Sequence, residues 1–148
     1  MRYVLACAVF IAGCATVREP APVSESAPAP APTPAPAART ESVAIAGLLD
    51  GARADLAAGR LANAAASLER ALRIEPRNPR LWQELARVRL RQGDYAQAEG
   101  VAARSNSWAG ADNALRADNW RLIAEARAAR GDADGARAAL ETAARIGR

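Results

Sequence analysis

The chain of 148 residues contains no histidine and no lysine, and its two cysteines, Cys7 and Cys14, both lie near its start. Beyond residue 14 the chain therefore lacks the most common general base and any thiol nucleophile. No metal-ligand cluster and no phosphate-cradling glycine loop stands out, and Asp132 with Asp134 fits the acidic start of a helix. The sequence predicts a protein that is not an enzyme and that uses no metal and no cofactor.

The chain also lacks a large excess of charge of one sign, and it lacks cysteines that could form a disulfide beyond residue 14. The net charge is +4, and the arginines that supply all the positive charge are spread along the chain. Nucleic-acid binding requires a clustered basic face, so we expect no nucleic-acid partner. Because no cysteine follows Cys14, the rest of the chain must be stable through packing alone.

The first residues have the pattern of an export signal. Arg2 precedes a short apolar run, Val4 to Phe10, and small residues follow at Ala12 and Gly13. A positive start, an apolar segment and small residues at the cleavage site are the three parts of a signal peptide. The run has about half of the ~20 residues that a membrane-spanning helix needs. An uncleaved membrane-associated helix is the alternative.

The string Ile11-Ala12-Gly13-Cys14 resembles the lipobox of bacterial lipoproteins. The resemblance implies that residues 1–13 are removed and that Cys14 is the lipidation site. Ala15 follows, where an aspartate retains enteric lipoproteins in the inner membrane, so the resemblance implies an outer-membrane anchor. The remainder would face the periplasm.

A linker follows the predicted lipid site, over residues 14–42. Seven of the nine prolines lie between Glu19 and Ala38, mostly alternating with alanine. Proline disfavours helix for the residue before it, and the segment lacks the large apolar residues of a core. We expect a disordered, extended spacer whose ~28 residues reach about 85 Å at roughly 3.1 Å per residue.

From Val43 onward the apolar residues recur at helical spacing. Gly59, Gly93 and Gly131 each follow a helical run, where a glycine of positive φ ends a helix. Asn78-Pro79 predicts an N-cap with proline in the first turn, and Asp94 with Gln97 predicts a capping box. The last helix is expected at about 133–146.

The glycines reveal a period, because Gly59 and Gly93 are 34 residues apart. A helix-turn-helix unit of that length resembles the tetratricopeptide repeat. The resemblance implies an all-α solenoid of about three helical hairpins over 43–148, with repeats at about 45–78, 79–112 and 117–148. Gly93 and Gly131 are 38 residues apart, so the first helix of repeat three is expected to start early, near Asp112.

The residues that carry the resemblance are small or apolar and stand at the family's key positions. They are Ala52, Gly59, Leu61, Ala64, Leu68, Ala71 and Pro76 in repeat one, Trp82, Leu85, Ala86, Gly93, Tyr95 and Ala98 in repeat two, and Trp120, Ile123, Ala124, Gly131, Ala136, Leu140 and Ala143 in repeat three. Trp82 and Trp120 are expected in the core. Because no solvating cap helix follows, the last helix must face water or a partner.

In this family the first helix of each repeat lines a groove that binds protein segments. By position, the lining would consist of Leu49, Arg53, Leu56, Arg80, Gln83, Arg87, Leu90, Arg91, Arg121 and Glu125. Arginines in one groove favour a carboxylate-bearing partner, although each could instead belong to a solvated face. Trp108, expected in a loop at Asn106 to Gly110, is either an interface anchor or buried over a hairpin end.

The whole layout resembles the outer-membrane lipoprotein activators of class A peptidoglycan synthases in pseudomonads and relatives, with 69–94 and 119–131 most like that group. The resemblance implies binding to a class A penicillin-binding protein and stimulation of its glycan synthesis. An assembly or piloting lipoprotein for a pilus, secretin or outer-membrane complex is the alternative. A carbohydrate-binding envelope protein is a third possibility, which the scarcity of aromatic residues disfavours.

Overall fold

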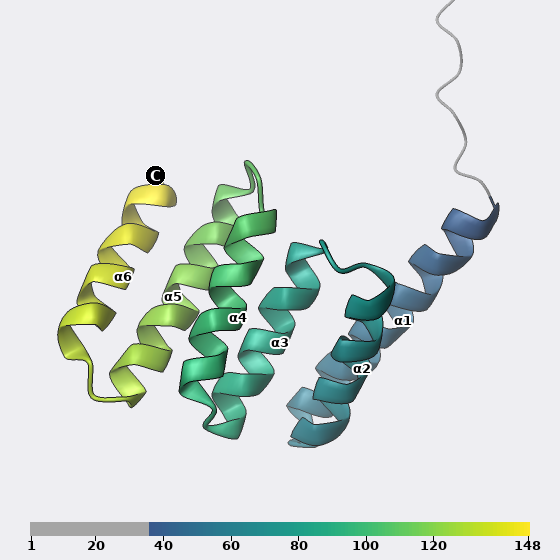
Figure 1. Cartoon of the computed structure of the whole chain (residues 1–148), viewed down its shortest axis with the longest axis horizontal. Helices are drawn as coiled ribbons and strands as arrows, with labels where there is room; N and C mark the ends of the chain where they lie inside the picture. Colours follow the sequence, from purple (N-terminus) through teal and green to yellow (C-terminus); the bar gives the residue numbers. More distant parts are fainter. Residues whose placement is uncertain (1–35) are drawn as a thin grey trace, which may run out of the picture. The chain divides into compact units, whose positions relative to one another are not determined.

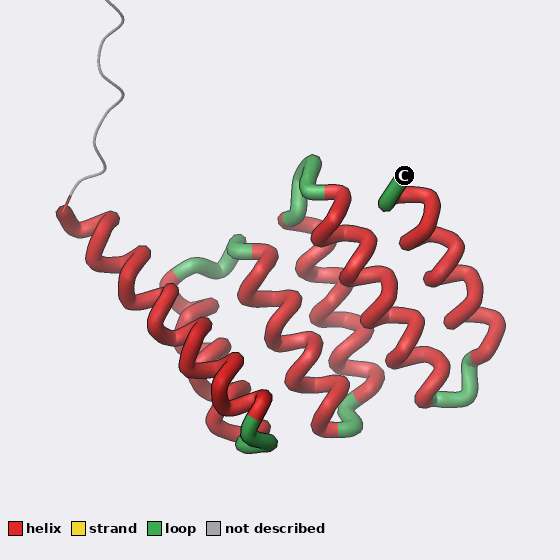
Figure 2. Tube along the Cα trace, turned by 180° about the vertical axis from the view of Figure 1, so that it is seen from behind, coloured by secondary structure: helices red, strands yellow, loops and turns green. Residues whose placement is uncertain are grey.

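A computed structural model describes residues 36–148, with side chains from residue 43 onward. The predicted signal peptide, Cys14 and the linker up to residue 35 lie outside the described residues. The described part consists of helices and short connections, without a strand (Figure 2). None of these helices combines the length and apolar character needed to cross a bilayer.

The helices form three hairpins that stack in chain order (Figure 1). In each hairpin the first helix packs against the second, and the second then packs against the first helix of the next hairpin. The three hairpins are α1 (Pro36–Ala57) with α2 (Leu61–Ile74), α3 (Pro79–Gln92) with α4 (Tyr95–Trp108), and α5 (Asn113–Ala129) with α6 (Ala133–Ile146). The arrangement confirms the all-α tetratricopeptide solenoid of three hairpins.

Most helix ends lie where the sequence placed them. Gly59, Gly93 and Gly131 have φ of 74°, 82° and 84° in the turns between paired helices. The side chain of Asn78 accepts hydrogen bonds from the backbone N–H groups of the residues that follow Pro79, which confirms the predicted N-cap. Helix α5 starts early, after Asp112, as the longer third period predicted.

Three local predictions differ from the structure. Helix α1 begins at Pro36, ahead of the expected domain start at Val43, because proline is tolerated in a first helical turn and alanine is a strong helix former. Helix α4 continues through Trp108, so the expected loop at Asn106 to Gly110 is confined to the residues after it. Asp94 makes no side-chain capping bond, and its carboxylate lies 3.9 Å from Arg89 instead.

The core combines small residues between helices with a few large ones between hairpins. Ala64, Ala86 and Ala102 are fully buried, which lets helices approach closely, and Leu68 and Leu81 fill the space between the first two hairpins. Trp82 and Trp120 are partly buried and pack against the two core clusters, as expected.

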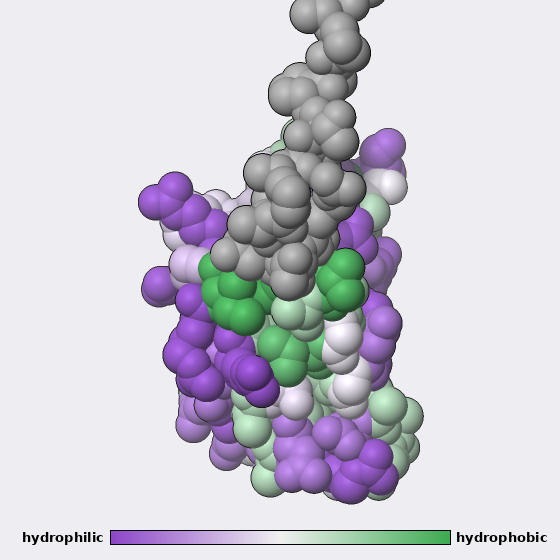
Figure 3. Space-filling model, turned by 90° about the vertical axis from the view of Figure 1, so that its right-hand side faces the viewer, coloured by the Kyte–Doolittle hydropathy of each residue, from purple (hydrophilic) through white to green (hydrophobic). Residues whose placement is uncertain are grey.

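Apolar side chains are exposed at both ends of the stack. Figure 3 views the α1 end, where apolar residues lie among polar ones, and Val43 is 72% exposed. At the other end Leu140 of α6 is 52% exposed, because no other described helix covers this position. The last helix therefore meets water in the described structure.

Candidate functional site

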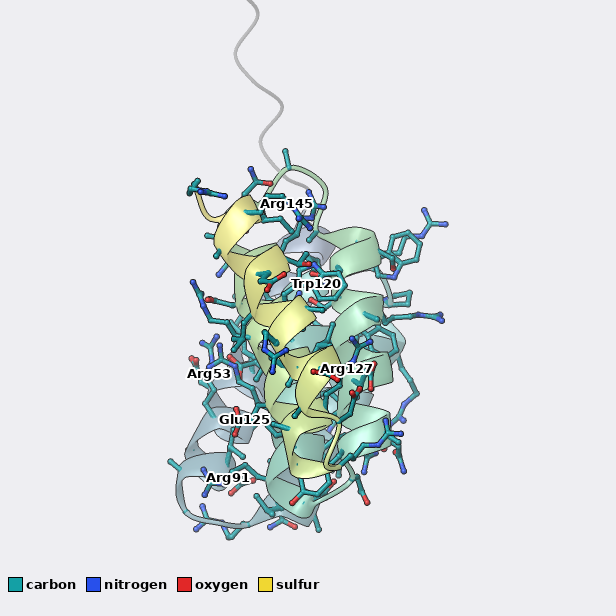
Figure 4. All side chains as sticks on the ribbon, turned by 90° about the vertical axis from the view of Figure 1, so that its left-hand side faces the viewer. Arg53, Arg91, Trp120, Glu125, Arg127 and Arg145 are labelled. Atoms are coloured by element: carbon teal, nitrogen blue, oxygen red, sulfur yellow. The ribbon has the colours of Figure 1, made fainter. Side chains whose placement is uncertain are left out.

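The predicted binding residues other than Trp108 lie on α1, α3 and α5, the first helices of the three hairpins. We call this surface the A-helix face. Figure 4 shows Arg53, Arg91 and Glu125 on the same side of the molecule, away from Arg127. Helix α3 contacts both α1 and α5, so its residues stand at the centre of this face.

The centre of the A-helix face is an ion cluster around Glu84, a residue that the sequence did not single out. Glu84 is 7% exposed, and Arg53 of α1 reaches its Oε1 with both Nε and Nη2 at 2.9 Å. Arg87, one turn further along the helix surface, places its Nε 4.0 Å from the other oxygen, Oε2. The buried carboxylate therefore ties α1 to α3 and holds Arg87 in place.

Two hydrogen-bond donors beside this cluster have no acceptor. The Nε2 of Gln83 and the Nε of Arg87 are both buried, and neither finds a hydrogen-bond partner within the structure. Residues four apart on a helix are neighbours, so these two donors belong to one region of α3. A buried donor without an acceptor is costly, and a partner's oxygen could relieve that cost only if Gln83 or Arg87 changed its rotamer.

The other predicted arginines are less available than the sequence suggested. Arg80 lies 3.6 Å from Asp112, and Arg121 pairs with Asp118 on its own helix. Arg91 and Glu125 are exposed and form no ion pair with any described residue, whereas Leu49, Leu56 and Leu90 are partly buried. The A-helix face thus carries mixed charge, with positive charge left over at Arg87 and Arg91.

Trp108 lies apart from the A-helix face. It is the last residue of α4, it is 39% exposed, and the guanidinium of Arg77 lies over its ring at 5.2 Å. The side chain is therefore neither in a loop nor fully buried over a hairpin end, and its role as an interface anchor stays a prediction.

Two further arginines, which sequence reasoning missed, join successive hairpins. In the repeat pattern a tyrosine stands seven residues after the tryptophan, and this chain has Arg89 and Arg127 there. Arg89 bonds Glu69 of α2 at 2.7 Å, and Arg127 bonds Glu99 of α4 at 2.8 and 2.6 Å. The departure from the repeat pattern was the available signal for these bridges.

Within the described residues, no group of three or more carboxylates or other ligating side chains gathers that could hold a metal ion. Two open cavities are present, one of about 570 Å³ along Glu75 to Arg80 and one of about 280 Å³ along Gly93 to Gln97 with Arg130. Of the predicted binding residues only Arg80 lines either of them, so an extended partner suits the A-helix face better than a small molecule.

Comparison with known proteins places this geometry among protein-binding repeats. Residues 55–117 match the tetratricopeptide repeat family. The globular C-terminal domain of P. aeruginosa LpoP, a solved structure, is 49% identical with a TM-score of 0.66, and the match covers 67% of this chain and 93% of that domain. No curated protein matches the chain.

Proposed function

Because the chain belongs to the LpoP family of tetratricopeptide-repeat lipoproteins, we propose that it docks on a class A penicillin-binding protein and stimulates peptidoglycan synthesis. The observation that carries the proposal is the 49% identity over nearly all of the LpoP domain. Stacked helical repeats of this kind commonly bind protein partners, and we expect the same of this domain. The synthase as partner, the lipid on Cys14 and the outer membrane are parts of the proposal.

The proposed arrangement assigns a separate task to each segment. Lipid on Cys14 would hold the chain at the outer membrane, and stable anchoring needs more than one acyl chain. The Ala/Pro linker would span part of the periplasm. The hairpin domain would then present its A-helix face to the synthase.

On that face, the guanidinium groups of Arg87 and Arg91 set the partner's chemistry. The Arg87 side chain is 43% exposed and Arg91 is exposed, so both can receive an oxygen acceptor. A carboxylate on an extended segment of the synthase supplies such an acceptor. The buried Glu84, already engaged by Arg53, also lies 4.0 Å from the Nε of Arg87 and so restrains that side chain.

The experiment adds the full-length chain, purified in mild detergent, to the cognate class A synthase and follows lipid II polymerisation and crosslinking. We expect stimulation by the wild-type chain. Arg87→Gln and Arg91→Glu should each weaken synthase binding roughly tenfold, which corresponds to about 1.4 kcal/mol, within the usual range for one charge-assisted hydrogen bond.

Arg145→Glu is the matched control for Arg91→Glu. Arg145 is also exposed, bonds only Thr142 among the described residues, and lies on α6 outside the A-helix face. It should leave stimulation unchanged. A wild-type chain that neither binds nor stimulates the synthase would reject the activator role for that enzyme, and the assembly role would then be tested by piliation.

A further inference from the structure

The connection between α2 and α3 is held rigidly from both sides. Asn78 donates from Nδ2 to Glu75 Oε2 at 2.7 Å, and the indole N–H of Trp82 donates to the carbonyl oxygen of Pro76 at 2.8 Å. From α4, the hydroxyl of Ser105 donates to the carbonyl oxygen of Pro79 at 2.7 Å. The loop is therefore fixed before any partner arrives, which lowers the entropy lost on binding.

Two arginine–tryptophan stacks adjoin this loop. The guanidinium of Arg77 lies 5.2 Å from the centroid of the Trp108 ring, and that of Arg104 lies 5.3 Å from the centroid of the Trp82 ring. Arg104 and Trp108 are one turn apart on α4, and Trp82 bonds the residue before Arg77. We call these four residues the Arg–Trp surface.

The Arg–Trp surface carries positive charge that the described part of the chain does not neutralise. Neither Arg77 nor Arg104 forms an ion pair with a described residue, whereas nearby Asp112 is engaged by Arg80. A guanidinium stacked on an indole keeps its N–H donors in the plane of the fork, where a carboxylate binds with two hydrogen bonds. The open cavity of about 570 Å³ borders the same loop and includes Arg77 in its lining.

We propose that the Arg–Trp surface is a second protein-docking site, separate from the A-helix face, and that it binds an acidic segment of a partner protein. Carboxylates of the segment pair with Arg77 and Arg104, and an apolar or aromatic residue next to them packs on the exposed part of Trp108. Tryptophan and arginine are the residues that most often dominate binding at protein interfaces. The charge of the surface and its prearranged loop favour an acidic peptide over an apolar one.

The test uses a random copolymer of glutamate and tyrosine as the probe, fluorescently labelled, and measures its anisotropy with the full-length chain in detergent. We expect binding that weakens as salt rises. Trp108→Ala should lower the affinity about tenfold, and the double variant Arg77→Glu/Arg104→Glu should abolish binding. Circular dichroism checks that each variant keeps its helical content and melting temperature.

Two controls separate this surface from the rest of the molecule. Arg145→Glu, combined with Leu140→Ala, changes the charge by two units, half of the change in the double variant, removes exposed apolar area on α6, and should leave probe binding unchanged. Probe binding that depends on Arg87 rather than on Arg77 and Arg104 would overturn the proposal. The proposal would also be overturned if the wild-type chain did not bind the copolymer but was retained on anionic phosphatidylglycerol vesicles, and if the double variant lost that retention.

Discussion

Replacing Asn119 with alanine tests how the second and third hairpins are joined. Asn119 is fully buried, and its Nδ2 donates to Ser105 Oγ at 2.7 Å and to Asn106 Oδ1 at 3.0 Å. Ser105 in turn donates to the carbonyl oxygen of Pro79. This small polar network connects α5, α4 and the start of α3 inside an otherwise apolar interface.

The expected loss follows from opposing contributions. Two lost hydrogen bonds destabilise by about 2 kcal/mol together, and the space left by the amide adds about 1 kcal/mol. The Oδ1 of Asn119 has no hydrogen-bond partner, so its removal returns about 1 kcal/mol. The free energy of unfolding should therefore fall by about 2 kcal/mol, which lowers the melting temperature by about 8 °C in a domain of this size.

The assay is urea denaturation of the chain followed by circular dichroism, with Asn119→Ala, Ser105→Ala and the double variant. Because the two side chains share a hydrogen bond, the double variant should lose about 1 kcal/mol less than the sum of the single ones. Losses that add within about 0.3 kcal/mol, or a loss below about 0.5 kcal/mol for Asn119→Ala, would refute the network as the source of stability.

Four further substitutions probe turns, a helix interior and a joint between hairpins, each measured by the same urea denaturation. Gly93→Ala should destabilise by about 1 kcal/mol because its φ of 82° disfavours a side chain, whereas Gly100→Ala, inside α4 with nothing within 4 Å of the added carbon, should stabilise by about 0.5–1 kcal/mol; equal signs would contradict this reasoning. Asn78→Ala should lose about 1 kcal/mol with its cap; no loss would mean that solvent replaces the cap. Arg127→Lys should lose about 0.5–1 kcal/mol, since lysine cannot form the two bonds to Glu99 at this partly exposed site, and the loss should shrink in high salt; a loss independent of salt would indicate packing instead.

The helix boundaries were predictable because they depend on residues that lie close together in the sequence. Gly59, Gly93 and Gly131 end helices through a backbone conformation that favours glycine, and Asn78 with Pro79 begins one through a side-chain cap. The period between the glycines then predicted that the hairpins follow one another in chain order. The contacts between successive helices confirm that order.

Interactions between hairpins were not predictable in the same way, because they depend on which side chains the stacking brings together. In the sequence, nothing distinguishes Glu84 from other helical glutamates. Its role follows from the contact with Arg53, which lies 31 residues earlier on another helix. Nothing in the sequence distinguishes Ser105 from other helical serines, yet it accepts a hydrogen bond from Asn119. The capping prediction at Asp94 was wrong because it used sequence spacing alone and left out the competing charge of Arg89.

The position of α1 determines how the domain responds to mechanical load. A pull on the chain ahead of Pro36 enters the folded body through α1, which packs chiefly against α2. Force reaches α3 directly through the Arg53–Glu84 pair, and also through the α2–α3 joint, where the Arg89–Glu69 pair spans the two helices. We expect tension on α1 to act first on the first hairpin and on the Arg53–Glu84 pair, which joins α1 to α3. Loss of that pair would leave the buried Glu84 without its closest partner and would change the surroundings of Arg87.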